Sequence, residues 1–243
     1  MFDCNVCSSN DKNYISLCYA QAKQTDLSGL CFTEHVVFPF ESEKCRKLAH
    51  KSLEILSGAI VPFEYETHSR LALEILSRSY DYVVNSVLTV EGNDIRSLEY
   101  YSARSRAEAY EKYLQKVFDS LDAAFDFSCL GSIAAPGKYA YYPSPALCYR
   151  EFPDLFDSIL MRTAYCGKGL ELDASLLGDK SLFDKNILAR FREFGGEIVT
   201  IGSNASNPKF IGNNFDLAKQ MLENCGFSYY TVFKNKLPEM HKI

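Results

Sequence analysis

The stretch Gly195–Ser206 (GGEIVTIGSNAS) ends in small polar side chains that could take part in binding or catalysis. Two glycines precede a β-branched run, Ile198–Ile201, and a polar cluster, Ser203–Ser206, follows the run directly. Buried parallel strands are rich in such β-branched residues. In α/β barrels, the residues that follow the carboxyl ends of the strands line the active site. Ser203–Ser206 is therefore a candidate site element.

A second candidate for chemistry is the C-x-x-C pair formed by Cys4 and Cys7. This spacing occurs in redox pairs and in one half of a zinc knuckle, but the second half of a knuckle is missing here. Residues three apart on a strand point to opposite faces of the sheet. The predicted strand at residues 2–6 therefore argues against a redox pair.

Composition limits the classes of function. The chain has 243 residues, of which 47% are hydrophobic, which is enough for one full core. A net charge of −5 indicates neither nucleic acid nor an anionic membrane as a partner. The first residues do not resemble a signal peptide, and no apolar run approaches the ~18 residues of a membrane span. Nine cysteines without disulfide spacing are typical of reduced thiols, so we expect a cytoplasmic protein.

The elements that must position these residues alternate along the chain. The predicted strands are Phe2–Val6, Gly29–Thr33, Ala59–Glu64, Tyr82–Val87, Phe127–Leu130, Gly169–Asp173 and Ile198–Ile201. The predicted helices are Tyr14–Gln24, Glu41–Leu56, His68–Ser77, Ser97–Ala123, Phe152–Cys166, Asp184–Phe194 and Phe215–Asn224. Tyr229–Phe233 is an eighth strand or a closing edge, and Pro62 predicts a kink or bulge in the third strand. This alternation predicts a parallel sheet covered by helices, and the absence of a linker favours one closed barrel over residues 1–243.

Motifs follow the predicted strands in a recognisable order. They are Asp3–Cys7 (DCNVC), Thr33–His35 (TEH), Pro62–Glu64 (PFE), Ser86–Leu88 (SVL), Leu130–Ala134 (LGSIA), Leu170–Ser175 (LELDAS) and Ser203–Ser206 (SNAS). This order resembles the PHP (polymerase and histidinol phosphatase) family over nearly the whole chain, and most closely its histidinol-phosphatase branch. The resemblance implies a distorted (β/α)7 TIM-like barrel of the PHP type.

The resemblance also implies a cluster of two or three divalent metals that binds phosphate and generates a hydroxide nucleophile. His35 and Glu64 keep the family's ligand types. The ligand positions that carry other residues are Asn5, Cys7, Leu88, Ser132, Asn204 and Ser206. Neutral amides and hydroxyls do not neutralise clustered dications, and leucine offers no ligand atom. The whole chain contains only four histidines. These departures predict that the metal-dependent phosphomonoesterase activity has been lost.

Two interpretations of the remaining polar residues stay open. In the first, Cys7, His35 and Glu64 form a reduced site for one divalent metal, with Asp3 or Asp173 nearby. Thiolate, imidazole and carboxylate ligands suit zinc with a fourth position open for water. In the second, no metal or other cofactor is bound, and His35 and Glu64 are remnants that hydrogen-bond to each other or to the substituting asparagines.

An aromatic segment at residues 137–149 (GKYAYYPSPALCY) follows the fifth strand motif and could form a pocket rim or lid. Lys138 matches a basic position of the family and could hold phosphate as a point charge, or it could be a solvated loop lysine. The tyrosines of this segment could stack on a ligand, but we expect them to pack against the rim.

We therefore expect a PHP-like pseudoenzyme whose barrel mouth binds a small phosphorylated or anionic ligand, or a protein partner. One alternative is a divergent histidinol-phosphate phosphatase, or another metal-dependent hydrolase, with a reduced metal site. Another is a non-catalytic assembly subunit of an active homologue.

Overall fold

A parallel sheet forms the centre of the molecule. The computed structural model describes residues 1–243 except residues 8–11, 37–52, 132 and 179–180. The sheet has the strand order β1-β2-β3-β4-β7-β8-β9, and every neighbouring pair is parallel. The strands are β1 (Phe2–Cys7), β2 (Gly29–His35), β3 (Glu54–Pro62), β4 (Tyr82–Ser86), β7 (Cys129–Leu130), β8 (Gly169–Asp173) and β9 (Val199–Gly202). Their interiors are almost fully buried, which explains why apolar runs predicted them.

The sheet curls until its last strand reaches its first. Just beyond β9, Asn204 N–H donates to the carbonyl of Asn5 at 2.9 Å, and Cys7 N–H donates to the carbonyl of Ala205 at 3.0 Å. A Cβ on Gly202 would lie 2.5 Å from the Cβ of Asn5, so the glycine allows this close approach. The result is a nearly closed, distorted barrel with seven strands in its sheet, which confirms the predicted fold class.

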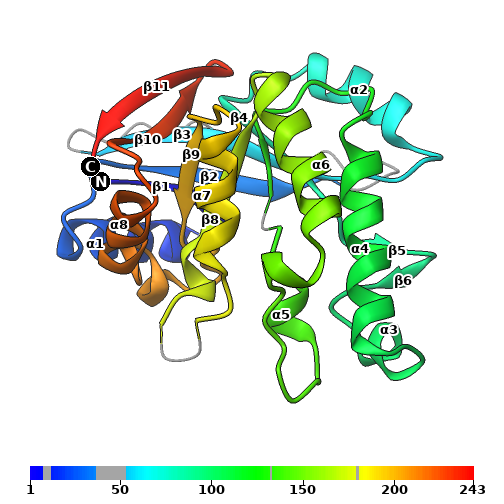
Figure 1. Cartoon of the computed structure of the whole chain (residues 1–243). Coiled ribbons are helices and arrows are strands. Elements are labelled where there is room, and N and C mark those ends of the chain that lie inside the picture. The colour runs from blue at the N-terminus through cyan, green and yellow to red at the C-terminus, as the bar shows by residue number, and fades with distance from the viewer. Residues whose placement is uncertain (8–11, 37–52, 132, 179–180) are drawn as a thin grey trace.

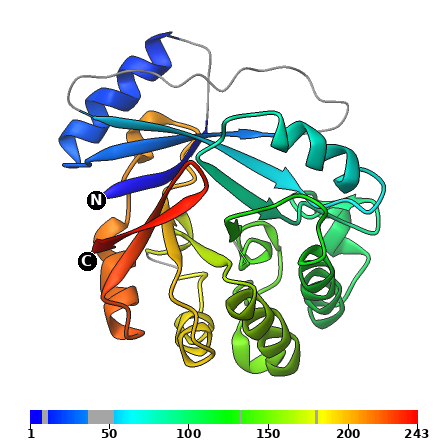
Figure 2. The same ribbon diagram turned by 90° about the horizontal axis from the view of Figure 1, so that it is seen from above.

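Helices cover the outside of the barrel (Figures 1 and 2). The helices in the described part of the chain are α1 (Lys12–Gln24), α2 (His68–Leu76), α3 (Leu98–Ser102), α4 (Arg106–Ser120), α5 (Pro136–Tyr139), α6 (Pro153–Tyr165), α7 (Lys185–Glu193) and α8 (Phe215–Asn224). Short 3-10 turns lie at Tyr149–Glu151, Ala174–Leu176 and Pro208–Phe210. No helix among these residues is both long enough and apolar enough to cross a membrane.

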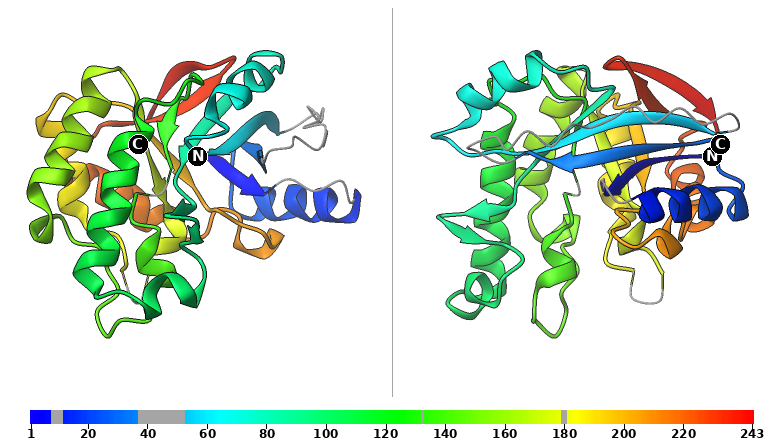
Figure 3. Two further views of the ribbon diagram at one scale, coloured as in Figure 1. Left: turned by 90° about the vertical axis from the view of Figure 1, so that its right-hand side faces the viewer. Right: turned by 180° about the vertical axis from the view of Figure 1, so that it is seen from behind.

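Two hairpins add to the barrel. β5 (Thr89–Val90) pairs with β6 (Asn93–Asp94), and β10 (Tyr229–Lys234) pairs with β11 (Leu237–Lys242). The second hairpin packs beside β9 and is fastened at the start of β4, where Asp81 accepts a hydrogen bond from Asn235 N–H at 3.0 Å. It lies at the end of the barrel where both chain termini are found (Figures 1 and 3).

Three predicted elements differ from the structure. Most of the predicted helix Glu41–Leu56 lies outside the described residues, but its end is wrong because residues 54–56 pair with β2 as the start of β3. The predicted helix Ser97–Ala123 is two helices, because the chain turns at Ser105, whose hydroxyl accepts from Glu108 N–H and caps α4. The strand at Tyr229–Phe233 does not close the barrel but pairs with β11, which the sequence analysis did not predict.

The predicted disturbance at Pro62 coincides with the end of a strand. Pro62 is the last residue of β3, and the next residue, Phe63, donates its N–H to the carbonyl of Ser86 at 2.8 Å. Proline lacks an N–H, so it is tolerated where the ladder ends.

Candidate functional site at the barrel mouth

Asn5, one of the substituted ligand positions, lies inside the barrel with its amide fully engaged. Its Nδ2 donates to both carboxyl oxygens of Glu171, each at 3.1 Å. Its Oδ1 accepts from the hydroxyl of Thr33 at 2.7 Å. Asn5 is 2% exposed. The amide therefore joins β1, β2 and β8 across the interior, and its oxygen already has a donor.

Glu171 is the central acid of this network. The hydroxyl of Tyr82 lies 3.3 Å from its Oε2 and 2.8 Å from the hydroxyl of Thr200. Burial, and secondarily the negative charge of Asp173, raise the pKa of Glu171 to about 8. Glu171 is therefore mostly a neutral carboxylic acid at pH 7.

Asp3 ties the first strand to the end of the last one. Its Oδ1 accepts from the N–H groups of Ser203 at 2.9 Å and Asn5 at 3.2 Å, and its Oδ2 accepts from Gly212 N–H at 3.2 Å. Burial raises its pKa to about 6, although these donors oppose the rise. Asp3 therefore organises the backbone around the polar cluster Ser203–Ser206.

Asn204 is the substituted residue at the centre of that cluster. It has a left-handed backbone (φ 50°), which asparagine tolerates. Its Nδ2 donates to Asp173 Oδ2 at 3.0 Å, while Asp173 Oδ1 accepts from Ser175 N–H at 2.9 Å. Ser206, two residues further on, is exposed. The amide nitrogen of Asn204, not its oxygen, therefore faces the carboxylate of β8.

Glu64, a retained ligand position, follows β3 and is held by two other elements. Lys116 Nζ from α4 lies 2.9 Å from Glu64 Oε2. The hydroxyl of Thr89 donates to Glu64 Oε1. Both carboxylate oxygens of Glu64 thus accept from donors within the protein, and one of these donors, the ammonium of Lys116, carries a full positive charge.

His35, the other retained position, ends β2 and is exposed. Desolvation by the surrounding protein, and secondarily the positive charge of Arg96, lower the pKa of His35. Cys7 ends β1 and is half-buried, and burial raises the pKa of its thiol.

The described residues outside the gaps at 8–11, 37–52, 132 and 179–180 contain no group of three His, Cys, Asp or Glu side chains that could hold a metal ion. Cys7, His35 and Glu64 are thus not brought together as one ligand group. Ser132 lies outside the described residues. Leu88 is half-buried just before β5, and its carbonyl accepts from Ile95 N–H at 2.9 Å.

Lys138 lies on α5 with an exposed side chain. Its Nζ donates to the hydroxyl of Ser175 at 3.0 Å, and the structure records no ion pair for it among the residues it describes. Further along this segment, Tyr142 donates to the carbonyl of Arg104 at 3.0 Å, and Tyr149 donates to Asp157 at 2.8 Å. These contacts confirm packing for the two tyrosines, and they leave Lys138 as an available cation at the barrel mouth.

Sequence comparison identifies the family. The PHP domain model matches residues 6–175, which is more than half of the chain. The chain belongs to the PHP domain family. It is 27% identical over 209 residues to a probable histidinol-phosphatase of Clostridium acetobutylicum, covering 81% of this chain and 82% of that protein. It is 22% identical over 233 residues to the histidinol-phosphatase of Lactococcus lactis subsp. lactis, covering 89% and 87%.

The crystal structure of the Lactococcus lactis histidinol phosphate phosphatase, complexed with zinc, L-histidinol and phosphate, has a similar fold. The TM-score is 0.87 at 19% sequence identity, and 98% of each chain is covered. This agreement over the full length confirms the PHP barrel. This chain is a histidinol-phosphatase-like PHP domain.

The side chains of this PHP barrel do not fit the metal cluster that the family resemblance implies. The amide nitrogens of Asn5 and Asn204 each donate to a carboxyl group, so they would repel a cation placed there. The carboxylate of Glu64 is already neutralised by Lys116. At each of these positions the side chain contacts a partner within the protein.

Sequence analysis missed the partners that complete these contacts. Glu171, Tyr82 and Thr33 belong to strands whose apolar character dominated the prediction. Lys116 lies between Tyr113 and Val117 on the buried side of α4. A lysine within an apolar stripe indicates a buried charge that needs a partner, and this was the one signal available in the sequence. The identity of its partner was not available, because Glu64 is 52 residues away in sequence.

Proposed function

We propose that this PHP domain has lost metal-dependent phosphomonoesterase activity and binds a small phosphorylated or anionic ligand at its barrel mouth. The observation that carries the proposal is the engagement of three ligand positions by partners within the protein. Asn5 donates to Glu171, Asn204 donates to Asp173, and Glu64 is paired with Lys116.

The orientation of the Asn5 amide is the chemical reason why this residue is a poor metal ligand. An asparagine can bind a cation only through its oxygen. The oxygen of Asn5 accepts from the hydroxyl of Thr33 inside the barrel, so a cation bound at this oxygen would displace that donor. A buried amide that loses its partners is destabilised by about 1–3 kcal/mol per group. Metal binding through Asn5 would have to overcome that loss.

A binding role is supported by Lys138. Its ammonium is exposed beside the hydroxyl of Ser175, so an anion can approach both donors. The thiol of Cys7 lies in the electrostatic field of Lys138, which places this lysine near the end of β1. A protein partner, including an active homologue in an assembly, is an alternative occupant of the mouth.

The test combines metal analysis with a turnover assay on the purified full-length chain. We expect less than about one equivalent of Mn, Fe or Zn per chain and no hydrolysis of histidinol phosphate after each metal is added. The proposal fails if the protein retains about two or more equivalents and hydrolyses the phosphate.

The second candidate function is a divergent phosphatase with a reduced metal site. The similarity to histidinol-phosphatases over more than four fifths of the chain favours it. The discriminating variants are His35→Ala and Glu64→Ala. If both leave any measured turnover unchanged and alter only thermal stability, the reduced site does not exist.

A further inference from the structure

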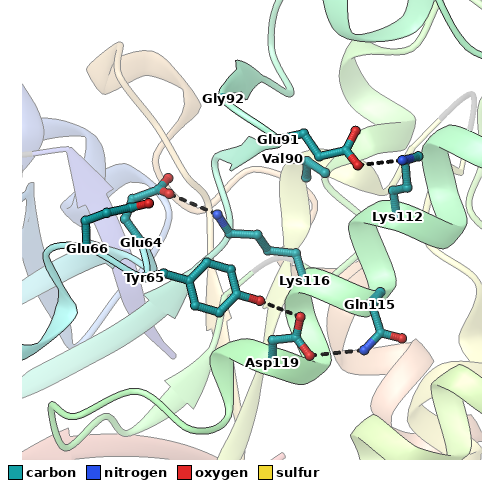
Figure 4. A pocket seen from close by; sticks show the side chains of 10 residues that line it. All are labelled: Glu64, Tyr65, Glu66, Val90, Glu91, Gly92, Lys112, Gln115, Lys116 and Asp119. Atoms are coloured by element: carbon teal, nitrogen blue, oxygen red, sulfur yellow. Dashed lines mark hydrogen bonds and ion pairs between the residues drawn. The ribbon is translucent and has the colours of Figure 1, made fainter.

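Lys116 is a positive charge held within the apolar side of α4. The residue is only 8% exposed. Its neighbours Tyr113 and Val117 on the same helix are buried. Its ammonium points toward the segment after β3 and meets Glu64 Oε2 at 2.9 Å (Figure 4). A lysine in this position needs a partner, because an unpaired buried charge is strongly unfavourable.

Aromatic rings complete the surroundings of this ammonium. Nζ of Lys116 lies 5.2 Å from the ring centroid of Tyr65 and 5.9 Å from that of Phe63. Both distances are within the range of a cation–π interaction. The hydroxyl of Thr89 engages the second oxygen of Glu64. The ammonium therefore has one carboxylate and two aromatic rings as neighbours.

The ion pair borders a pocket of about 480 Å³ between α4, the β5–β6 hairpin and the segment after β3. Its lining includes four carboxylates (Glu64, Glu66, Glu91 and Asp119) and two lysines (Lys112 and Lys116), as Figure 4 shows. The formal charge of this lining is −2 with both lysines present. Removal of either lysine would make it −3. The pocket therefore becomes more attractive to cations when one ammonium is lost.

The two lysines are not equivalent. Lys112 pairs with Glu91, whose side chain is 52% exposed and also pairs with Arg104. Lys116 pairs with Glu64, and these two side chains are 10% and 29% exposed. Water screens the first pair much more than the second. The chain thus offers a matched pair of sites one helical turn apart on α4, one exposed and one enclosed.

We propose that the ammonium of Lys116 is a tethered cation that takes the place of a divalent metal ion beside Glu64. Helix α4 then supplies, as part of the fold, a positive charge that a metal-dependent barrel acquires from solution. Glu64 becomes an anchor for α4 rather than a ligand. This inference rests on the proposed loss of metal chemistry and names the residue that makes Glu64 unavailable.

The test is to remove the tethered cation and to titrate the full-length chain with MnCl2 by isothermal titration calorimetry. Lys116→Met keeps an unbranched side chain of similar length without the charge. We expect Lys116→Met to bind Mn²⁺ roughly tenfold more tightly than the natural chain. Adding Glu64→Gln to this variant should abolish the gain. Lys116→Arg retains the cation and should not gain affinity.

Lys112→Met is the matched control. It removes one positive charge from the same pocket, but its partner Glu91 is exposed and keeps its ion pair with Arg104, so we expect Mn²⁺ affinity within about twofold of the natural chain. An equal gain in Lys112→Met and Lys116→Met would overturn the proposal, because net charge alone would then explain binding. A folded Lys116→Met variant without any gain would also overturn it.

Thermal unfolding supplies a test that does not depend on the folding of Lys116→Met. Glu64→Gln leaves the enclosed ammonium without its counter-charge, whereas Glu91→Gln removes the exposed carboxylate that pairs with Lys112 and Arg104. We expect a clearly larger fall in melting temperature for Glu64→Gln, and equal falls would refute the tethered-cation role.

The outcomes also separate this inference from the proposed function. If the natural chain binds Mn²⁺ through Glu64 and hydrolyses histidinol phosphate, both fail. If the natural chain is inactive and Lys116→Met gains no Mn²⁺ affinity, only the tethered cation fails.

Discussion

The raised pKa of Glu171 predicts that the stability of this barrel falls as the pH rises toward 8. The native carboxyl has a pKa of about 8, compared with 4.5 for an ordinary glutamate. Between these values the native state holds a proton that the unfolded chain releases. Because the unfolded state binds fewer protons, the free energy of unfolding decreases with increasing pH. The stabilisation is complete below about pH 4 and is lost as the pH passes through about 8.

The magnitude follows from the two pKa values. Integration of the proton linkage from about pH 6 to about pH 8 gives a loss of about 2 kcal/mol for this one group. Asp3 changes stability in the same direction, but its pKa of about 6 confines most of its effect to lower pH. The lowered pKa of His35 acts in the opposite direction, and mainly below its ordinary value of 6.5. The range from about pH 7 to about pH 8 is therefore governed by Glu171.

The assay is urea unfolding, followed by far-UV circular dichroism at several pH values, of the natural chain and Glu171→Gln. Glutamine keeps the size of the side chain and does not titrate. It replaces one of the two oxygens that accept from Asn5 Nδ2 by an NH2 donor, so the variant is expected to be less stable at pH 6 by about 1 kcal/mol. The decisive quantity is the slope with pH and not this offset. We expect the natural chain to lose about 2 kcal/mol more than the variant between about pH 6 and about pH 8. Parallel slopes would refute the assignment of Glu171 as a neutral acid.

Three further predictions concern the closing seam, the hairpin and the mouth. Gly202→Ala places a Cβ 2.5 Å from the Cβ of Asn5 and should destabilise the barrel by about 1–3 kcal/mol in urea unfolding; an unchanged midpoint would contradict the close approach of β9 to β1. Asp81→Ala removes the acceptor of the backbone N–H groups of Ser57 and Asn235 and should lower stability by about 2–4 kcal/mol. Asp81→Asn keeps an acceptor oxygen and should lose less stability. Equal losses would contradict the role of Asp81 as the acceptor that fastens the hairpin. Lys138→Ala should weaken the binding of inorganic phosphate roughly tenfold in calorimetry. Lys209→Ala is its control, and equal effects of the two changes would argue against a phosphate contact at Lys138.

The sequence by itself determined the barrel and the order of its parts. Apolar, β-branched runs such as Ile198–Ile201 are a local signal of a buried parallel strand, and the regular alternation with helices fixes the topology. The same local reading failed at residues 54–56. Apolar residues there fit a helical spacing, but parallel pairing with β2 makes them the start of β3. Short apolar runs satisfy both periodicities, so the tertiary pairing decides between them.

The substituted ligand positions were also apparent from the sequence, because they are single residues within recognisable motifs. What those residues do was decided only by the tertiary structure. Asn5 meets Glu171, which is 166 residues away, and Glu64 meets Lys116, which is 52 residues away. No local pattern connects such pairs. They are brought together by the curling of the sheet and by the packing of α4 against it, and burial then makes each polar group depend on the partner it finds there.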